Sequence, residues 1–339
     1  MPRSVRPWAI ALAGAVLLLP VGGCGAATRP AASWANPPSV TDSPSGLNGG
    51  SAAPSASASL SPSPSGNRPS GRPSTGPVGP RTGKPGPGNT GVVPGTALMV
   101  VNGDQTFASN GTVITGKDFH GYVRVTGANI TFRNCIFRGG MPSGNNALLD
   151  TERGTTTVVE DSEFVPAHPA STIDGIWTNR TSIYRANIHG SVDGVKTGSG
   201  VLIQDSYIHD MSWFASDPNQ GGGETHNDGV QSFDGDSTVT LRHNTIDLSM
   251  THDGNAALQD SAHDIHVDRN WLDGGGCTLN FAHHGNVPLG GIFVTNNRFG
   301  RHSFYQCPIL ISTLTSLSAN SGNVWDDTGS AIPPPQQHD

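Results

Sequence analysis

The stretch of the sequence best equipped for chemistry is 224–231, which reads Glu-Thr-His-Asn-Asp-Gly-Val-Gln. It brings the carboxylates of Glu224 and Asp228, the imidazole of His226 and the amide of Gln231 close together along the chain. Carboxylates and imidazoles are the groups that most often transfer protons in general acid and base catalysis. We therefore treat Glu224, His226 and Asp228 as candidate catalytic residues, and Gln231 as a candidate binding residue.

An Asp-Gly pair occurs at Asp174, Asp193 and Asp228. Asp before Gly is ordinary turn chemistry, so a structural role for each carboxylate competes with a functional one. Carboxylate oxygens are also the ligands that Ca²⁺ prefers. The three aspartates are therefore candidate Ca²⁺ ligands, with a turn role as the alternative.

An eight-residue phrase with alternating apolar positions recurs through most of the chain. Copies lie at 130–137, 157–164, 181–188, 201–208, 239–246, 265–272 and 292–299. Most successive copies start between 20 and 27 residues apart, and this period is typical of solenoids. Short strands joined by turns, without a leucine-rich consensus, predict an all-β fold, a single-stranded right-handed parallel β-helix over residues 92–330.

Equivalent positions of the phrase should stack from coil to coil. We expect an inward ladder of Phe137, Phe164, Ile188, Ile208, Ile246, Leu272 and Phe299. We expect a second ladder, at a turn, of Ser206, Asn244, Asn270 and Asn297. Cys277 and Cys307 occupy equivalent places in neighbouring coils, so their α-carbons should lie within disulfide range. Cys135 takes the turn-ladder position and should be a buried, inert thiol.

In the second strand of the coils, alternation places Trp177, Lys196 and Gln231 outward on three successive coils. An aromatic ring, a cation and an amide in a row could bind a sugar, although a merely decorated surface is the alternative. The longest gap between phrases contains an insertion, residues 211–226, in which Trp213 could line a binding wall. His209 directly precedes this insertion, so we add His209 and Lys196 to the candidate catalytic residues.

The N-terminal region is typical of an exported protein. Residues 1–24 contain Arg3 and Arg6, an apolar run and Val-Gly-Gly-Cys24, which predicts a lipoprotein-type signal peptide with lipidation of Cys24. Ordinary cleavage near Ala26 is the alternative. Residues 25–91 are rich in Pro, Ser and Gly and predict a disordered linker, and 331–339 predict a disordered tail. We expect an extracellular protein anchored to the cell membrane through Cys24.

Charge separates the linker from the rest of the chain. Residues 1–90 contain seven of the 19 basic residues and one of the 26 acidic residues, so the remaining chain carries a formal net charge of −13. This charge argues against nucleic acid as a partner. It would also repel a polyanionic glycan unless Ca²⁺ or Lys196 offsets it locally. We expect a monomer.

Several of these phrases resemble a known family. Tyr207-Ile-His-Asp210, 226–231, Arg242-His-Asn-Thr-Ile246, Thr295-Asn-Asn-Arg-Phe299 and Ser321-Gly-Asn-Val-Trp325 are similar to secreted actinobacterial right-handed β-helix proteins of the pectate-lyase-like superfamily. That superfamily includes polysaccharide lyases, glycoside hydrolases, uronate epimerases and non-catalytic adhesins, so the fold alone does not select a function.

The resemblance implies a polysaccharide as partner. The activity we expect is that of a polysaccharide lyase on a uronic-acid-containing glycan, with Lys196 or His226 as base and Ca²⁺ as the cofactor. Signature motifs of the hydrolases and epimerases are absent, and Lys196 is the single basic residue that the repeat places on this face. A non-catalytic cell-surface carbohydrate-binding or adhesion module is the alternative.

Overall fold

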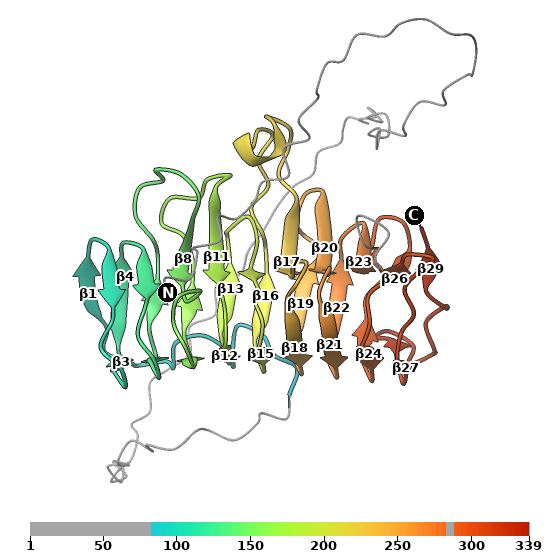
Figure 1. The fold of residues 1–339 in the computed structure, drawn as a ribbon, viewed down its shortest axis with the longest axis horizontal. Coiled ribbons are helices and arrows are strands. Elements are labelled where there is room, and N and C mark those ends of the chain that lie inside the picture. The colour runs from blue at the N-terminus through green and yellow to red at the C-terminus, as the bar shows by residue number, and fades with distance from the viewer. Residues whose placement is uncertain (1–82, 283–287, 339) are drawn as a thin grey trace, which may run out of the picture. The chain divides into compact units, whose positions relative to one another are not determined.

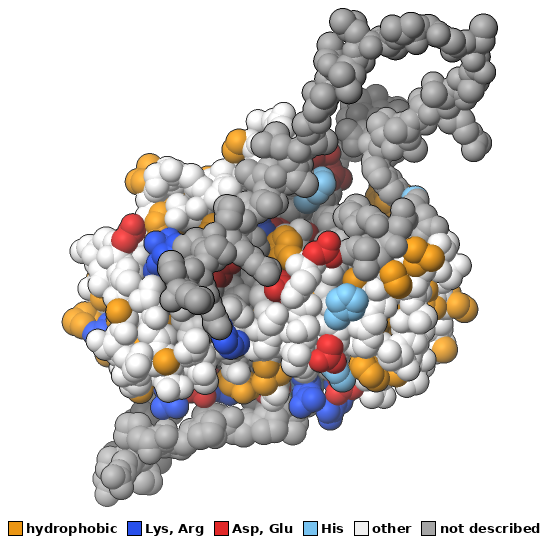
Figure 2. Space-filling view, in the orientation of Figure 1, with side chains coloured by type: hydrophobic (Ala, Val, Ile, Leu, Met, Phe, Trp, Pro, Cys, Tyr) orange, Lys and Arg blue, Asp and Glu red, His pale blue; other side chains and the backbone are white. Residues whose placement is uncertain are grey.

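A computed structural model describes residues 83–282 and 288–338, which form a parallel β-helix (Figure 1; space-filling view in Figure 2). The predicted signal peptide, Cys24 and the linker up to residue 82 lie outside the described residues. Three sheets run the length of the stack, and all of their strand pairs are parallel. The only helix in the described part is the short 3₁₀ helix η1 (Pro218–Gln220), and no described helix is long and apolar enough to cross a membrane.

Each coil contributes one strand to each sheet in turn, and the predicted β-helix is thereby confirmed. Sheet A contains β1 (Met99–Asn102), β4 (Lys117–His120), β7 (Ile136–Phe137), β10 (Glu163–Phe164), β13 (Asn187–His189), β16 (Tyr207–His209), β19 (Thr245–Leu248), β22 (Trp271–Gly274), β25 (Arg298–Phe299) and β28 (Val324–Trp325).

Sheet B contains β2 (Gln105–Phe107), β5 (Val123–Val125), β8 (Asn146–Asp150), β11 (Ile173–Trp177), β14 (Val195–Lys196), β17 (Asn227–Gln231), β20 (Gly254–Gln259), β23 (Cys277–Phe281), β26 (Cys307–Ile311) and β29 (Gln336–Gln337). We number the coils by these strands, so that coil 1 contains β2 and coil 10 contains β29. β29 lies in the segment for which a disordered tail was expected, and it pairs with β26.

Sheet C contains β3 (Val113–Thr115), β6 (Thr131–Arg133), β9 (Thr157–Glu160), β12 (Thr181–Tyr184), β15 (Val201–Gln204), β18 (Ser237–Arg242), β21 (His263–Asp268), β24 (Ile292–Thr295) and β27 (Ala319–Ser321). The chain therefore passes through sheets A, B and C in order within each coil. Turns between sheets A and B, called A–B turns below, lie at the beginning of the sheet B strands.

The predicted inward ladder is confirmed on sheet A. Its seven side chains are at most 1% exposed, and the strand register places each directly beside the next. Phe137 and Phe164 stack with their ring centroids 4.5 Å apart. Burial of this apolar surface in every coil is the main force that holds the coils together.

The predicted turn ladder is also confirmed, between sheets C and A. The backbone N–H of Asn244 donates to Asn270 Oδ1 at 2.8 Å, and that of Asn270 donates to Asn297 Oδ1 at 2.9 Å. Each Asn Nδ2 also donates to a sheet C carbonyl, as in the 2.9 Å bond from Asn270 to Leu241. Asn323 extends the ladder by one coil. Buried polar groups are thus satisfied along the whole row.

Cys277 and Cys307 form the predicted disulfide between coils 8 and 9, with their α-carbons 4.7 Å apart. Cys135 is a buried free thiol in the turn ladder, as expected. Burial raises its pKa, which keeps it protonated and unreactive. The disulfide fixes the A–B turn that precedes β26.

Residues 83–95, called the strap below, run along the outside of the solenoid at the junction of sheets C and A (Figure 1). The hydroxyl of Thr245 in coil 7 donates to Pro85 O at 2.8 Å, and Gly91 N–H donates to Arg185 O at 2.8 Å. Val93 N–H donates to Asn134 Oδ1 at 3.0 Å. Nine of these residues were expected to belong to the disordered linker, yet their backbone is bonded to the solenoid.

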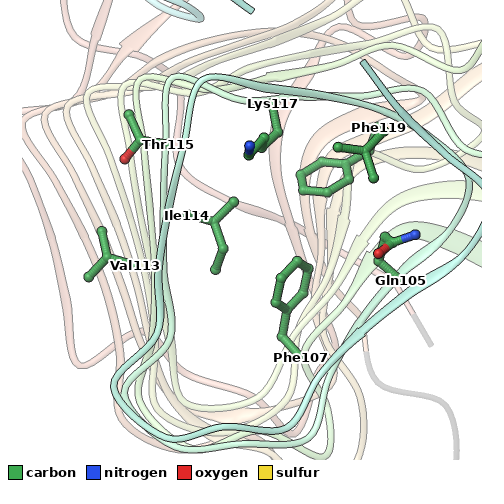
Figure 3. A pocket seen from close by; sticks show the side chains of 8 residues that line it. Gln105, Phe107, Val113, Ile114, Thr115, Lys117 and Phe119 are labelled. Atoms are coloured by element: carbon green, nitrogen blue, oxygen red, sulfur yellow. The ribbon is translucent and has the colours of Figure 1, made fainter. Parts of the chain in front are cut away.

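The first coil leaves the end of the apolar interior open. A cavity of about 510 Å³ opens there, and Phe107, Ile114 and Phe119 point to the inside of the coil, whereas Val113 and Thr115, which also line the cavity, point to the other side of their strand (Figure 3). A second cavity, of about 450 Å³, lies beside Arg180 and Thr238 at the turns between sheets B and C.

Candidate functional site

The outward row of sheet B carries the predicted binding residues. Trp177, Lys196 and Gln231 are direct register partners on β11, β14 and β17, so their predicted placement on three successive coils is confirmed. The register extends this row in both directions. Its members from coil 2 to coil 8 are Arg124, Asp150, Trp177, Lys196, Gln231, Gln259 and Asn280.

Two of the Asp-Gly aspartates have alanine as their register partner. Asp174 pairs with Ala147, and Asp228 pairs with Ala256. A bulge between Asn227 and Asp228 shifts the register at the second of these places. The outward residue of coil 7 is consequently Gln259, which is largely covered, with 8% of its surface exposed.

The three Asp-Gly aspartates form a buried stack beneath this row. The backbone N–H of Asp193 donates to Asp174 Oδ1 at 3.4 Å, and that of Asp228 donates to Asp193 Oδ1 at 2.8 Å. Asn255 Nδ2 continues the stack by donating to Asp228 Oδ1 at 2.9 Å. Each carboxylate thus caps the start of the next sheet B strand, which is the turn role that competed with a catalytic one.

Lys196 neutralises part of this acidic stack. Its Nζ lies 2.7 Å from Asp174 Oδ2 and 3.0 Å from Asp193 Oδ2. Burial alone lowers the pKa of Lys196, but the two carboxylates outweigh it and raise the pKa above its ordinary value. Lys196 is therefore protonated at neutral pH and acts as a cation, not as a base. Trp177 is tied to the same group, because its Nε1 donates to Asp174 Oδ2 at 2.7 Å.

The other two aspartates hold protons more tightly than usual. Burial raises the pKa of Asp193 to about 6, with Lys196 opposing the shift, and raises that of Asp228 well above its ordinary value. Asp228 is fully buried, and its Oδ2 has no hydrogen-bond partner among the described residues. A protonated Asp228 removes the cost of an unpaired buried charge, and its burial prevents contact with a ligand.

The expected Ca²⁺ site does not match the oxygen arrangement. Lys196 Nζ already lies between the carboxylates of Asp174 and Asp193, where a cation would bind. Within residues 83–282 and 288–338, no group of three or more His, Cys, Asp and Glu side chains is arranged to hold a metal ion.

His209 lies on a different sheet from Lys196 and Gln231. It belongs to β16 of sheet A, where its ring stacks on Tyr207 with centroids 3.8 Å apart. Its Nδ1 lies 2.7 Å from Asp210 Oδ2, and its Nε2 lies 3.0 Å from Asn187 Oδ1. Burial lowers the pKa of His209. The structure therefore does not place His209 in the row with Lys196.

The insertion rises from the A–B turn of coil 6 (Figure 1). Its 3₁₀ helix η1 is capped by Asp217, and Asn219 exchanges two hydrogen bonds of 2.9 and 3.0 Å with Asn145 of coil 3. The Trp213 ring packs edge to face on His252 of the next turn, with centroids 4.5 Å apart. The insertion thus spans several A–B turns as a wall along the beginning of sheet B.

His226 and Glu224 lie at the end of this wall, immediately before β17. His226 is exposed and Glu224 is half-buried. Between them, the Thr225 hydroxyl donates to Asn227 Oδ1 at 2.9 Å, and Asn227 Nδ2 donates to Val192 O at 2.9 Å. This buried bonding fixes the backbone that carries His226.

Sequence reasoning did not single out Asn280 and Asn255. Asn280 completes the outward row in coil 8, and Asn255 ends the aspartate stack. Asn280 could have been predicted from strand alternation, because the residue after an inward-facing leucine points outward. Leu279 is buried and in register with Leu258. Asn255 is passed over in the strand register, because Asn227 pairs with Gly254 and Asp228 pairs with Ala256.

Comparison of the chain with protein-family models, with curated proteins and with solved structures finds no match.

Proposed function

We propose that this protein binds an extracellular polysaccharide along the outward row of sheet B. The observation that carries the proposal is the alignment of Trp177, Lys196 and Gln231 in direct register, with Asn280 two coils beyond Gln231. Successive strands are about 4.8 Å apart, a repeat comparable to the length of one sugar ring in an extended chain. A polysaccharide lying along the solenoid axis would meet one outward side chain per ring.

The side chains suit sugar recognition. A half-buried indole such as Trp177 offers an apolar face for a pyranose ring, and its orientation is fixed by the bond to Asp174. The amides of Gln231 and Asn280 can both donate to and accept from hydroxyl groups. Trp177, Lys196 and Gln231 are half-buried side chains on the outward side of one sheet, and a row of this kind suits a long polymer better than a small enclosed substrate.

The charges favour a neutral glycan over a uronan. Lys196 is already paired with Asp174 and Asp193, and Arg124 is paired with Asp150 at 3.0 Å. A uronan carboxylate would therefore meet no uncompensated cation on this row. Burial of an additional carboxylate beside the aspartate stack would be unfavourable.

A polysaccharide lyase is the second candidate. The exposed imidazole of His226 beside β17 and the protonated Lys196 on β14 favour it, because β-elimination needs a base and a cation near the substrate carboxylate. In that reaction His226 would remove the proton next to the carboxylate, and Lys196 would stabilise the enolate. The enolate would then collapse to a C=C double bond as the glycosidic C–O bond breaks, and the leaving oxygen would take up a proton from water. Lys196 is protonated and His209 lies on sheet A, so neither of them is the base in this reaction.

Binding is tested by affinity electrophoresis of the full chain in gels that contain β-1,4-glucan, β-1,4-xylan, β-1,4-mannan or polygalacturonate. We expect retardation by at least one neutral polymer, and we expect Trp177→Ala to weaken that binding about tenfold. Trp271→Ala is the matched control, since Trp271 is an outward tryptophan on sheet A. The proposal is overturned if no polymer retards the protein, or if both variants bind like the parent.

The lyase candidate has a separate readout. Incubation with polygalacturonate and with alginate, with and without added Ca²⁺, would generate unsaturated products that absorb ultraviolet light. Product formation that His226→Ala abolishes would replace simple binding as the function. Neutral-polymer binding without any product from either uronan would reject the lyase.

We also propose an extracellular location with membrane attachment through a lipid on Cys24, supported by the apolar run and Val-Gly-Gly-Cys24 in the sequence. Expression in a bacterial host with a lipoprotein pathway, followed by detergent partitioning, tests it. The parent should enter the detergent phase and Cys24→Ala should not. Equal partitioning of both proteins would reject the anchor.

A further inference from the structure

The A–B turn at 300–306 displays two aromatic rings to solvent. Phe304 is 65% exposed and Tyr305 is 53% exposed, and the rings meet edge to face with centroids 4.9 Å apart. Most large apolar side chains of the described solenoid are buried inside it, so this pair is an exception. Exposed aromatic pairs on a rigid base commonly mark binding sites.

The turn that carries these rings is firmly held. The N–H groups of Phe304 and Tyr305 donate to Gly275 O and Gly276 O at 2.8 and 3.1 Å. The Asp273 carboxylate accepts from His302 N–H at 2.9 Å, and the Cys277–Cys307 disulfide follows the turn directly. The rings are thereby presented in a fixed orientation, which reduces the entropy lost on binding.

Tyr305 lies over the beginning of sheet B. A Cβ added at Gly276 would lie 3.4 Å from Tyr305 Cε2 and 3.5 Å from Asn255 O, so the ring lies directly over the backbone at the start of β23. Asn255 is the residue that ends the aspartate stack. The aromatic pair therefore borders the same sheet that carries the outward row.

We infer that Phe304 and Tyr305 form a second sugar-stacking platform, so that the ligand is an oligosaccharide long enough to reach from Trp177 to Tyr305. The inference rests on the proposed function. Gly276 lies four strands along the axis from Trp177 and four residues before the outward position of β23, which corresponds to a separation of roughly 23 Å. A chain that follows the outward row past Lys196 and Gln231 and then bends toward the beginning of β23 reaches the second platform.

The size and surroundings of the pair select a glycan as its occupant. Two rings are far smaller than the roughly 800 Å² per partner that a stable protein interface buries. The adjacent side chains are charged and paired, as in the contact of His302 Nδ1 with Asp273 Oδ2 at 2.7 Å and the ion pair of Arg301 with Asp327 at 2.7 Å. An aromatic face bordered by polar groups matches the alternation of C–H faces and hydroxyls on a sugar.

The experiment measures binding as a function of ligand length, by calorimetry with the full chain. The probes are the disaccharide, tetrasaccharide and hexasaccharide of β-1,4-linked glucose and of β-1,4-linked mannose. We expect Tyr305→Ala and Phe304→Ala each to weaken hexasaccharide binding about tenfold and to leave disaccharide binding unchanged. Tyr305→Phe should retain the parent affinity, because the ring face is kept.

Leu314→Ala is the control for loss of an exposed apolar side chain, since Leu314 is 52% exposed in the turn after β26. It should bind all three lengths like the parent. If Trp177→Ala weakens binding but neither Tyr305→Ala nor Phe304→Ala affects the hexasaccharide, this inference fails and the proposed function stands. If no oligosaccharide and no polymer binds the parent, both fail.

Discussion

Lys196 Nζ and Asp174 Oδ2 lie 2.7 Å apart, and Trp177 Nε1 donates to the same oxygen at 2.7 Å. One buried carboxylate therefore positions both the cation and the aromatic ring of the outward row. The orientation of the candidate sugar platform is therefore linked to the ion pair, because Trp177 and Lys196 share the same carboxylate oxygen.

Replacement of Lys196 by Met should destabilise the fold. Removal of the ammonium leaves Asp174 and Asp193 as adjacent buried carboxylates without a counter-ion, a change that typically costs about 3 kcal/mol. The free energy of unfolding, measured by urea titration, should fall by that order at pH 8. The loss should be smaller at about pH 5, because Asp193, whose pKa burial raises to about 6, can then take up a proton.

A double variant, Lys196→Met with Asp174→Asn, provides the matched comparison, because it removes the charge pair together. It should recover part of the lost stability. An unchanged unfolding free energy for Lys196→Met alone would show that the ion pair does not stabilise the folded state.

Asp260 predicts a second pH dependence. It is fully buried, its Oδ1 is bonded to the Ser232 hydroxyl, and burial raises its pKa to about 7. The folded state therefore retains a proton that the unfolded chain releases near its ordinary pKa of 3.8, so stability falls as pH rises from about 4 to about 7 and then levels off. Asp260→Asn should remove this part of the slope.

Thermal unfolding of the parent and of Asp260→Asn across this pH range is the measurement. The variant should match the parent near pH 4 and exceed its stability above pH 7, on the order of 2 kcal/mol. Asp253→Asn, at an exposed carboxylate, should follow the parent at every pH. Parallel curves for the parent and Asp260→Asn would contradict the raised pKa.

The sequence predicted the scaffold far better than the site. The inward ladder from Phe137 to Phe299 and the turn ladder from Ser206 to Asn297 follow from a repeated pattern, because each coil needs the same side chains at the same stacked positions. The row of Trp177, Lys196 and Gln231 followed from the same alternation. These predictions required only the spacing of residues within and between the repeats of the sequence.

The remaining predictions required information that spacing does not contain. His209 is near His226 in sequence, but one belongs to sheet A and the other precedes a sheet B strand, so their side chains serve different faces. Residues 83–91 were expected to belong to the linker because their Pro- and Gly-rich composition is typical of linkers, whereas their hydrogen bonds are to distant residues such as Thr245. Hydrogen bonds between residues so far apart in the chain produce no periodic pattern in the sequence.

Replacement of Asn270 by Ala should weaken the turn ladder. Its Oδ1 accepts from the buried N–H and from Nδ2 of Asn244, and its Nδ2 donates to Leu241 O, so Ala leaves several buried polar groups unpaired. We expect a loss of about 3 kcal/mol in the free energy of unfolding. Asn270→Ser should lose less, because Ser206 occupies the equivalent place and accepts from Ala186 N–H at 3.0 Å. Equal losses would show that bonding at this turn is unimportant.

Replacement of Gly91 by Val should loosen the strap. Gly91 has a φ of +74°, and a Cβ there would lie 3.1 Å from Asn187 Cβ, so a β-branched side chain is both strained and crowded. Hydrogen exchange of the strap amides, followed by mass spectrometry, should become markedly faster. Gly88→Val is the matched control, because a Cβ at Gly88 meets no atom within 4 Å. Similar exchange in both variants would show that Gly91 does not fix the strap.

The strap also determines where a mechanical load would act. Its first backbone bond to the solenoid is at Thr245 in coil 7, and the chain then runs back toward β1 in coil 1. Tension applied through the chain before residue 83 would reach the middle of the stack before it reached the first coil. The bonds at Thr245, Arg185 and Asn134 would then resist in succession, so β1 would be protected from being peeled off until the strap had detached.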